Sequence, residues 1–132
     1  MIPEPYSMIV CPATPEHPRN GEADMIRLKN GDLLLAYGRW NGGQSDFDTA
    51  EIWCKTSSDG GKTWENIRVI DDADGRPWPG FAYTSITPVG DNIILTYWRD
   101  EPAGVSLKLK SFDYRWFYEA AKQPNKNLEP TN

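Results

Sequence analysis

The sequence Ser57-Ser58-Asp59-Gly60-Gly61-Lys62-Thr63-Trp64 decides the predicted fold of this chain. Two strand-like runs, Glu51–Thr56 and Glu65–Ile70, flank this stretch. Adjacent runs with strand-forming residues, joined by a short segment rich in Gly, Asp and Ser, are typical of a β-hairpin. The stretch therefore predicts a tight turn between two antiparallel strands.

The side chains of the turn suggest how it is held. Asp59 is expected to accept hydrogen bonds from the backbone amides one and two residues later, as in an Asx turn. The two glycines that follow can adopt positive φ without a Cβ clash. Ser57 and Thr63 are expected to tie the strand ends together through their hydroxyls, and Trp64 to fold back as an apolar lid.

Composition excludes several classes of protein. The 132 residues carry 19 acidic and 14 basic side chains, and the net charge of −5 argues against a nucleic-acid-binding protein. There is no apolar run long enough to predict a membrane span. Met1–Pro5 shows no secretory signal, which predicts a cytoplasmic protein, or a secreted one if the true N-terminus is missing. Cys11 and Cys54 lack metal-binding spacing and are interpreted as free thiols, with a disulfide between them as the alternative. We expect no cofactor and no metal.

Short apolar runs separated by turn residues predict an all-β fold. Besides the two strands at the turn, the expected strands are Tyr6–Val10, Asp24–Leu28, Leu33–Tyr37, Phe81–Pro88, Ile93–Arg99 and Val105–Lys110. The continuously apolar Leu33–Tyr37 predicts a strand buried on both faces. Trp116–Tyr118 is interpreted as a strand or a single helical turn, and Lys122–Asn132 as a disordered tail.

The turn at residues 57–64 resembles the Asp-box, the repeat of bacterial neuraminidases (sialidases) that joins the third and fourth strands of a β-propeller blade. Three further stretches resemble the same family. Pro18–Leu28 with Asn30–Tyr37 is similar to its opening blade, Gly80–Ile86 to the segment that carries its tyrosine, and Ser106–Lys110 with Trp116–Tyr118 to its closing strand and C-terminus.

This resemblance implies a fragment of a β-propeller built from four-stranded antiparallel blades. Residues 1–118 would hold a first blade at about 22–70 and a last blade at about 81–118, which the N-terminal strand 6–10 would complete, followed by a polar tail at 119–132. A six-bladed ring needs about 240–300 residues at ~40–50 per blade. The middle blades are absent, as in an internally truncated relative or a gene fragment.

The resemblance also implies the chemistry of an exo-sialidase. Sialidases use a tyrosine nucleophile, together with a Glu that takes its proton, an acid/base Asp and three arginines that bind the substrate carboxylate. Arg19 matches the first arginine, Asp46 the acid/base, with Asp48 as the alternative, and Tyr83 the nucleophile. No residue matches the Glu partner or the other two arginines.

Trp40 and Trp78 are expected to lie in loops and to stack on sugar rings. Each matched residue also has a structural interpretation. Arg19 could be a solvated charge, Asp46 a turn residue and Tyr83 a packing aromatic.

Three functions therefore stay open. The first is a sialidase-like glycoside hydrolase that is impaired or inactive as a lone chain. The second is a non-catalytic module that binds carbohydrate or associates with itself, and the third is a remnant without independent function. The expected partners are a carbohydrate (sialic acid or a related glycan) and further copies of the chain that complete the propeller, with no nucleic acid and no membrane.

Overall fold

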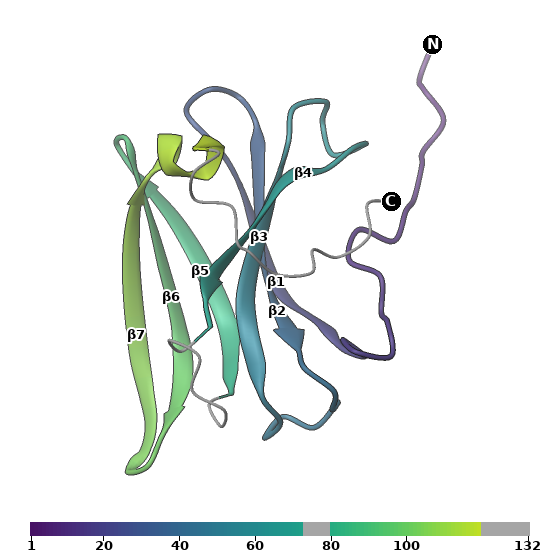
Figure 1. Ribbon diagram of the computed structural model, residues 1–132. Coiled ribbons are helices and arrows are strands. Elements are labelled where there is room, and N and C mark those ends of the chain that lie inside the picture. The colour runs from purple at the N-terminus through teal and green to yellow at the C-terminus, as the bar shows by residue number, and fades with distance from the viewer. Residues whose placement is uncertain (73–79, 120–132) are drawn as a thin grey trace.

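The computed structural model describes residues 1–72 and 80–119, which form two antiparallel sheets side by side (Figure 1). The first sheet has the order β1 (Asn20–Arg27), β2 (Leu33–Trp40), β3 (Ala50–Ser57), β4 (Glu65–Asp71). The second has the order β5 (Phe81–Val89), β6 (Asn92–Glu101), β7 (Gly104–Asp113), and a 3-10 helix, η2 (Tyr114–Tyr118), follows it. The all-β prediction is confirmed, and neither sheet closes on itself within the described residues.

Seven of the predicted strands form close to their expected positions, because their apolar runs are bounded by turn residues. The prediction that Leu33–Tyr37 is buried on both faces is confirmed for Leu34 to Tyr37, each of which is at most 4% exposed. Trp116–Tyr118 lies in the 3-10 helix, which agrees with the helical-turn alternative. The predicted disordered tail falls largely on residues 120–132, outside the described residues.

Residues 57–64 form the predicted tight turn between β3 and β4, but the hydrogen bonds of Asp59 differ from those expected. The Asp59 carboxylate accepts from the backbone amides of Lys62 and Thr63, three and four residues later, at 3.0 and 2.9 Å, instead of one and two residues later. The two glycines take φ of 77° and 97°, which lets the chain loop around the carboxylate so that these later amides point at it. The Asp59 carboxylate also accepts the hydroxyls of Ser57 and Thr63 at 2.9 and 2.6 Å.

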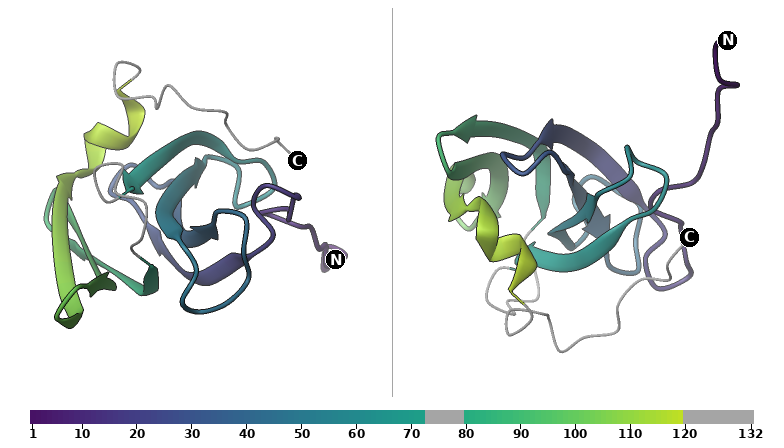
Figure 2. Two further views of the ribbon diagram at one scale, coloured as in Figure 1. Left: turned by 60° about the horizontal axis from the view of Figure 1, so that its bottom comes forward. Right: turned by 90° about the horizontal axis from the view of Figure 1, so that it is seen from above.

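The two sheets share one apolar core. The inward side chains of β2, β3, β5 and β6 meet there, and Phe117 of the 3-10 helix packs among them at 0% exposed. The views in Figure 2 place β1 of the first sheet beside β5 of the second, and these strands are in contact. The carboxylate of Asp24 on β1 accepts the backbone N–H of Ile86 on β5 at 2.8 Å, so a side chain substitutes for a missing strand partner.

The prediction of a strand at Tyr6–Val10 is wrong. These residues form no strand and lie against the first sheet, so the second sheet keeps three strands among the described residues. Lys55 donates to the carbonyl of Val10 at 2.7 Å, and Tyr6 donates to the carbonyl of Gly60 at 3.2 Å. Val10 and Cys11 pack on a second apolar cluster formed by Leu35, Tyr37, Trp53 and Ile67. The apolar pattern of the segment reflects this packing, not strand pairing.

Candidate functional site

The residues matched to the sialidase pattern come from three places at one end of the sheets, the lower end in Figure 1. Arg19 directly precedes β1, Asp46 lies in the loop between β2 and β3, and Tyr83 lies near the start of β5. Neighbouring strands run antiparallel, so β1, β3 and β5 all begin at this end. The three places therefore lie close together. The turn at residues 57–64 lies at the opposite end and takes no part in the site.

Arg19 is the centre of the cluster at this end. Its Nη1 donates to Asp46 Oδ1 at 2.7 Å and to the carbonyl of Gln44 at 2.8 Å. Its Nη2 lies 3.5 Å from Glu22 Oε1, and the guanidinium carbon lies 4.2 Å from the centre of the Trp40 ring. The structure thus brings Arg19 and Asp46 into direct contact. One cation is fixed between two carboxylates over an aromatic face, an arrangement that restricts the guanidinium to one orientation.

Glu22 is a member of this cluster that the sequence analysis did not identify. Its Oε1 faces Arg19, and its Oε2 accepts the backbone N–H of Tyr83 at 3.2 Å, so the side chain bridges the two sheets. The register of each strand shifts at this point, between Gly21 and Asp24 on β1 and between Ala82 and Ser85 on β5. Glu22 and Tyr83 have φ of 51° and 58°. Positive φ in residues other than glycine is costly and concentrates at functional sites.

Tyr83 joins the cluster through its backbone. The residue is 67% exposed, and its ring lies beside Trp98, with the ring centres 6.0 Å apart. Trp98 is on the face of the second sheet that points away from the shared core, since its neighbours Tyr97 and Arg99 are buried. Glu22 therefore lies between Arg19 and Tyr83. Among the described residues, no contact joins the Tyr83 ring to the Arg19 guanidinium.

The prediction that Trp40 stacks on a sugar ring is wrong. Trp40 is 1% exposed, belongs to β2, donates from Nε1 to the carbonyl of Ser45 at 2.9 Å, and has Arg19 over its ring. The second expected platform, Trp78, lies outside the described residues. Asp48, the alternative to Asp46, accepts the backbone N–H of Ser45 at 2.9 Å and so shapes the loop.

Two further arginines near this end are buried. Arg39 is 3% exposed, and its guanidinium carbon lies 4.3 Å from the centre of the Trp53 ring, on the face of the first sheet that the N-terminal segment covers. Arg99 is 8% exposed, and its Nε lies 3.5 Å from Glu101 Oε1. Neither side chain presents its guanidinium to solvent beside Arg19.

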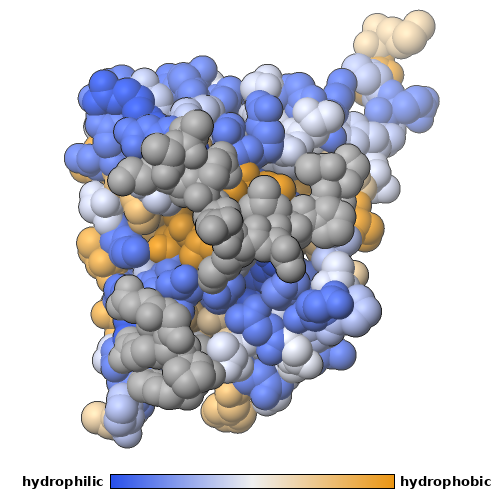
Figure 3. Space-filling model, viewed as in Figure 1, coloured by the Kyte–Doolittle hydropathy of each residue, from blue (hydrophilic) through white to orange (hydrophobic). Residues whose placement is uncertain are grey.

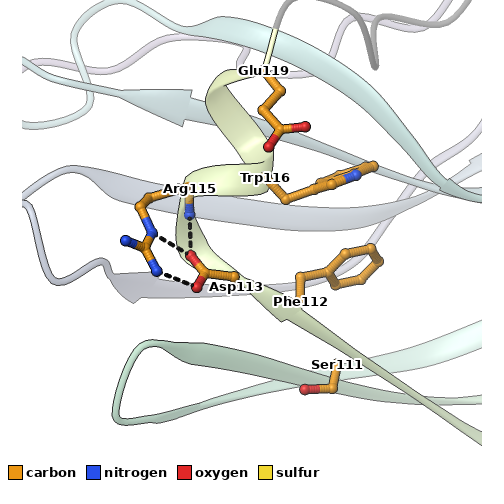
Figure 4. A pocket seen from close by; sticks show the side chains of 6 residues that line it. All are labelled: Ser111, Phe112, Asp113, Arg115, Trp116 and Glu119. Carbon is orange, nitrogen blue, oxygen red and sulfur yellow. Dashed lines mark hydrogen bonds and ion pairs between the residues drawn. The ribbon is translucent and has the colours of Figure 1, made fainter.

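A hollow lies elsewhere, at the 3-10 helix (Figure 4). It is open to solvent, has a volume of about 500 Å³ and is lined by Ser111, Phe112, Asp113, Arg115, Trp116 and Glu119. Arg115 is held there by Asp113, with Nη2 2.6 Å from Oδ2 and Nε 2.8 Å from Oδ1. The guanidinium of Arg115 is thus paired with a carboxylate, and none of the predicted site residues lines the hollow.

The described part of the chain contains no group of three or more His, Cys, Asp or Glu side chains arranged to hold a metal ion. Cys11 and Cys54 are free thiols. None of the described helical segments has the length and apolar character that crossing a bilayer requires. Comparison with models of protein families, with curated proteins and with solved structures finds no match to this chain.

Proposed function

We propose that this chain is a sialidase-like glycan-binding protein whose two sheets correspond to two neighbouring propeller blades, and that it binds sugar at the Arg19 cluster without turning it over on its own. The sequence resemblance supports the family and the location of the site. The observation that carries the proposal is the fixed Arg19 guanidinium, held between Asp46 and Glu22 at the end of the sheets where three strands begin.

This cluster suits sugar hydroxyls. A hydroxyl both donates and accepts, and the cluster offers carboxylate acceptors next to guanidinium donors. The Arg19–Asp46 pair is accessible to a ligand, because the Asp46 side chain is 68% exposed. An exposed ion pair contributes roughly 0–1 kcal/mol, so a ligand can replace one of its hydrogen bonds at small cost.

Two features favour binding over catalysis. The Tyr83 ring lies beside Trp98 instead of facing Arg19 and Asp46, and the guanidiniums of Arg39 and Arg99 are buried. Catalytic groups that act as a unit lose nearly all their effect when one is removed. Among the described residues, the site has one accessible arginine and no Glu that accepts from the Tyr83 hydroxyl. The chain is therefore expected to bind but not to hydrolyse a sialoside.

The test is binding of sialyllactose and lactose to the purified chain, followed by NMR chemical shifts of the backbone amides. We expect the largest shifts at residues 19–22 and 44–48, and at least a tenfold loss of affinity in Arg19→Ala. Arg27→Ala is the matched control, because Arg27 also belongs to the β1 region but donates to the carbonyl of Gly31 at the opposite end. Equal affinity in wild type and Arg19→Ala would overturn the proposed site.

The same two ligands test whether the site prefers an acidic or a neutral sugar. Preference for sialyllactose over lactose would show that the ligand carboxylate displaces Asp46 from Arg19. A fluorogenic sialoside tests turnover, with Tyr83→Phe as the control. Turnover by the wild type that Tyr83→Phe abolishes would restore the hydrolase interpretation and contradict binding without catalysis.

A further inference from the structure

The loop between β2 and β3 carries an exposed aromatic side chain beside the Arg19 cluster. Phe47 is 84% exposed and directly follows Asp46, whose carboxylate holds the Arg19 guanidinium. Figure 3 shows mainly hydrophilic surface at the lower end of the molecule, with only small hydrophobic patches at its lower margin. Single exposed apolar residues are common on protein surfaces. The significance of Phe47 therefore depends on how its loop is held.

Hydrogen bonds fix the backbone of the loop at and around Phe47. The hydroxyl of Ser45 accepts the backbone N–H of Phe47 at 3.2 Å. The carbonyl of Ser45 accepts the N–H of Asp48 at 3.0 Å and the indole N–H of Trp40 at 2.9 Å. The aromatic ring is thus attached to a fixed backbone through only two rotatable bonds, so little conformational entropy is lost when a ligand stacks on it.

The loop is also held against the second sheet. Gly80 directly precedes β5 and is buried. A Cβ atom at this position would lie 3.3 Å from the carbonyl oxygen of Asp48 and 3.7 Å from that of Asp46. A glycine here lets the loop approach the start of β5 closely. Both sheets therefore fix the position of Phe47 next to the Arg19 cluster.

We infer that Phe47 is the stacking platform for a neutral pyranose whose hydroxyls bind Asp46 and Arg19, an inference that rests on the proposed glycan-binding function. A pyranose ring has an apolar face of C–H groups and an edge of hydroxyls. The aromatic ring can contact the C–H face while the neighbouring carboxylate and guanidinium bind the hydroxyls. A purely apolar partner would instead desolvate the Asp46 carboxylate without replacing its hydrogen bonds to water.

The charge of the cluster favours a neutral sugar over an acidic one. The Arg19 guanidinium already faces the carboxylates of Asp46 and Glu22, so one positive and two negative charges leave a net charge of −1. The chain as a whole carries −5. A ligand carboxylate would have to displace Asp46 and would stay close to both acidic side chains, and this like-charge contact is unfavourable. A neutral hydroxyl can instead donate to Asp46 and accept from Arg19.

Tyr83 is a second exposed aromatic residue beside the cluster, but its position suits this sugar less well. Its ring lies beside Trp98 on the outer face of the second sheet, and Glu22 contacts its backbone and not its ring. Phe47, in contrast, belongs to the same loop as Asp46. A sugar bound between Arg19 and Asp46 is therefore expected to contact Phe47.

Titration with lactose, cellobiose and sialyllactose, followed by NMR, tests the class of ligand. We expect at least one of the neutral disaccharides to bind fivefold or more tightly than sialyllactose. When sodium chloride is raised from 50 to 500 mM, the affinity for the neutral sugar should stay constant. The affinity for sialyllactose should rise, because salt screens its repulsion from the cluster. Tighter binding of sialyllactose, or sialyllactose binding that weakens with salt, would overturn the preference for a neutral sugar.

Variants of Phe47 test the platform. Phe47→Ala should weaken binding of the preferred neutral sugar at least fivefold, and Phe47→Leu nearly as much, because leucine is apolar but has no flat face. Phe47→Trp should keep the affinity or raise it. Upfield shifts of the sugar C–H protons should appear with the wild type and disappear with Phe47→Leu. Tyr6→Ala is the matched control, since Tyr6 is an aromatic residue, 57% exposed, that contacts Gly60 at the opposite end.

The results of these titrations also separate the platform from the function on which it rests. Binding that Arg19→Ala weakens and Phe47→Ala does not would keep the proposed site and overturn the platform. Loss of binding in Tyr83→Ala but not in Phe47→Ala would assign the platform to Tyr83 and overturn the inference. If none of the three sugars binds, or if Arg19→Ala leaves their binding unchanged, the proposed function is overturned together with the inference.

Discussion

Asp59 shows how one side chain holds the turn at residues 57–64. The Thr63 hydroxyl donates to its carboxylate at 2.6 Å, and the Thr63 amide adds a second hydrogen bond. These bonds, the hydroxyl first, lower the pKa of Asp59 to about 2. Hydrogen bonds to the charged form of a carboxylate stabilise that form and the fold that supplies them.

We predict that Asp59 makes the stability of the chain depend on pH in the acid range. The pKa of Asp59 is lower in the folded chain than the ~3.9 of an unfolded aspartate, so its contribution is present above about pH 4. This contribution is lost as the pH falls towards 2. Melting temperatures measured from pH 2 to 7 should show a weaker decline in Asp59→Asn than in the wild type, and a lower plateau at pH 7 because Asn offers one acceptor oxygen instead of two. Glu65→Gln, on the exposed start of β4, is the control, and an identical decline in wild type and Asp59→Asn would contradict the prediction.

The two cysteines are predicted to differ in reactivity. Cys54 is 0% exposed in the core between the sheets, and burial raises the pKa of its thiol to about 12. The thiolate is the reactive form, so Cys54 should react only when the chain opens. At pH 8 a thiol reagent should modify one cysteine per folded chain quickly, and Cys11→Ser should remove this fast phase. Fast modification of both cysteines in the folded protein would show that the reagent reaches Cys54 without unfolding, which would contradict the prediction.

At the scale of the elements, β1 and β5 are joined by side chains at the place where their regular pairing is interrupted. Asp24 accepts the N–H of Ile86 through Oδ2 and the N–H of Met25 through Oδ1. We predict that Asp24→Ala lowers the free energy of unfolding by about 1–3 kcal/mol, since it leaves a partly buried amide without an acceptor. Asp24→Asn keeps an acceptor and should lose less. Urea unfolding measures both, and equal losses would assign the effect to charge instead of the hydrogen bond.

The strands could be predicted from the sequence because turn residues mark their ends, as Asn30-Gly31 and Gly90-Asp91 do. The strand expected at Tyr6–Val10 could not be distinguished from a packed segment, since burial of alternate side chains produces the same pattern in both. Whether such a segment pairs depends on a free strand edge beside it, and a sequence does not locate that edge.

The candidate site was predictable only in part. Arg19 and Asp46 were identified from their loops, and the structure brings them into contact. Glu22 was missed because its role depends on the register shift in β1, which turns its side chain towards β5, and no residue type marks that shift. Trp40 was placed in a loop because β2 was expected to end at Tyr37. The strand continues three residues further and carries Trp40 into the interior.

The whole molecule is held together by a core that belongs to both sheets. Leu34 and Ala36 of β2 meet Leu95 of β6 and Phe117 of η2 in one cluster, and all four are 0% exposed. A boundary between independently folding units would instead run between two separate cores. The arrangement therefore makes the two sheets a single cooperative unit, although they share no strand.

We predict that Leu95→Ala lowers the free energy of unfolding by about 2–5 kcal/mol, because it opens a cavity in this core. The loss of stability should be the same for both sheets. Hydrogen exchange of the slowest amides should accelerate by equal factors in β2 and in β6, since opening of one sheet exposes the core of the other. Leu107→Ala, on the exposed face of the same sheet, is the control and should change the free energy of unfolding little, because Leu107 is 77% exposed. Faster exchange confined to β5, β6 and β7 would show that the first sheet, with its covering N-terminal segment, folds without the second.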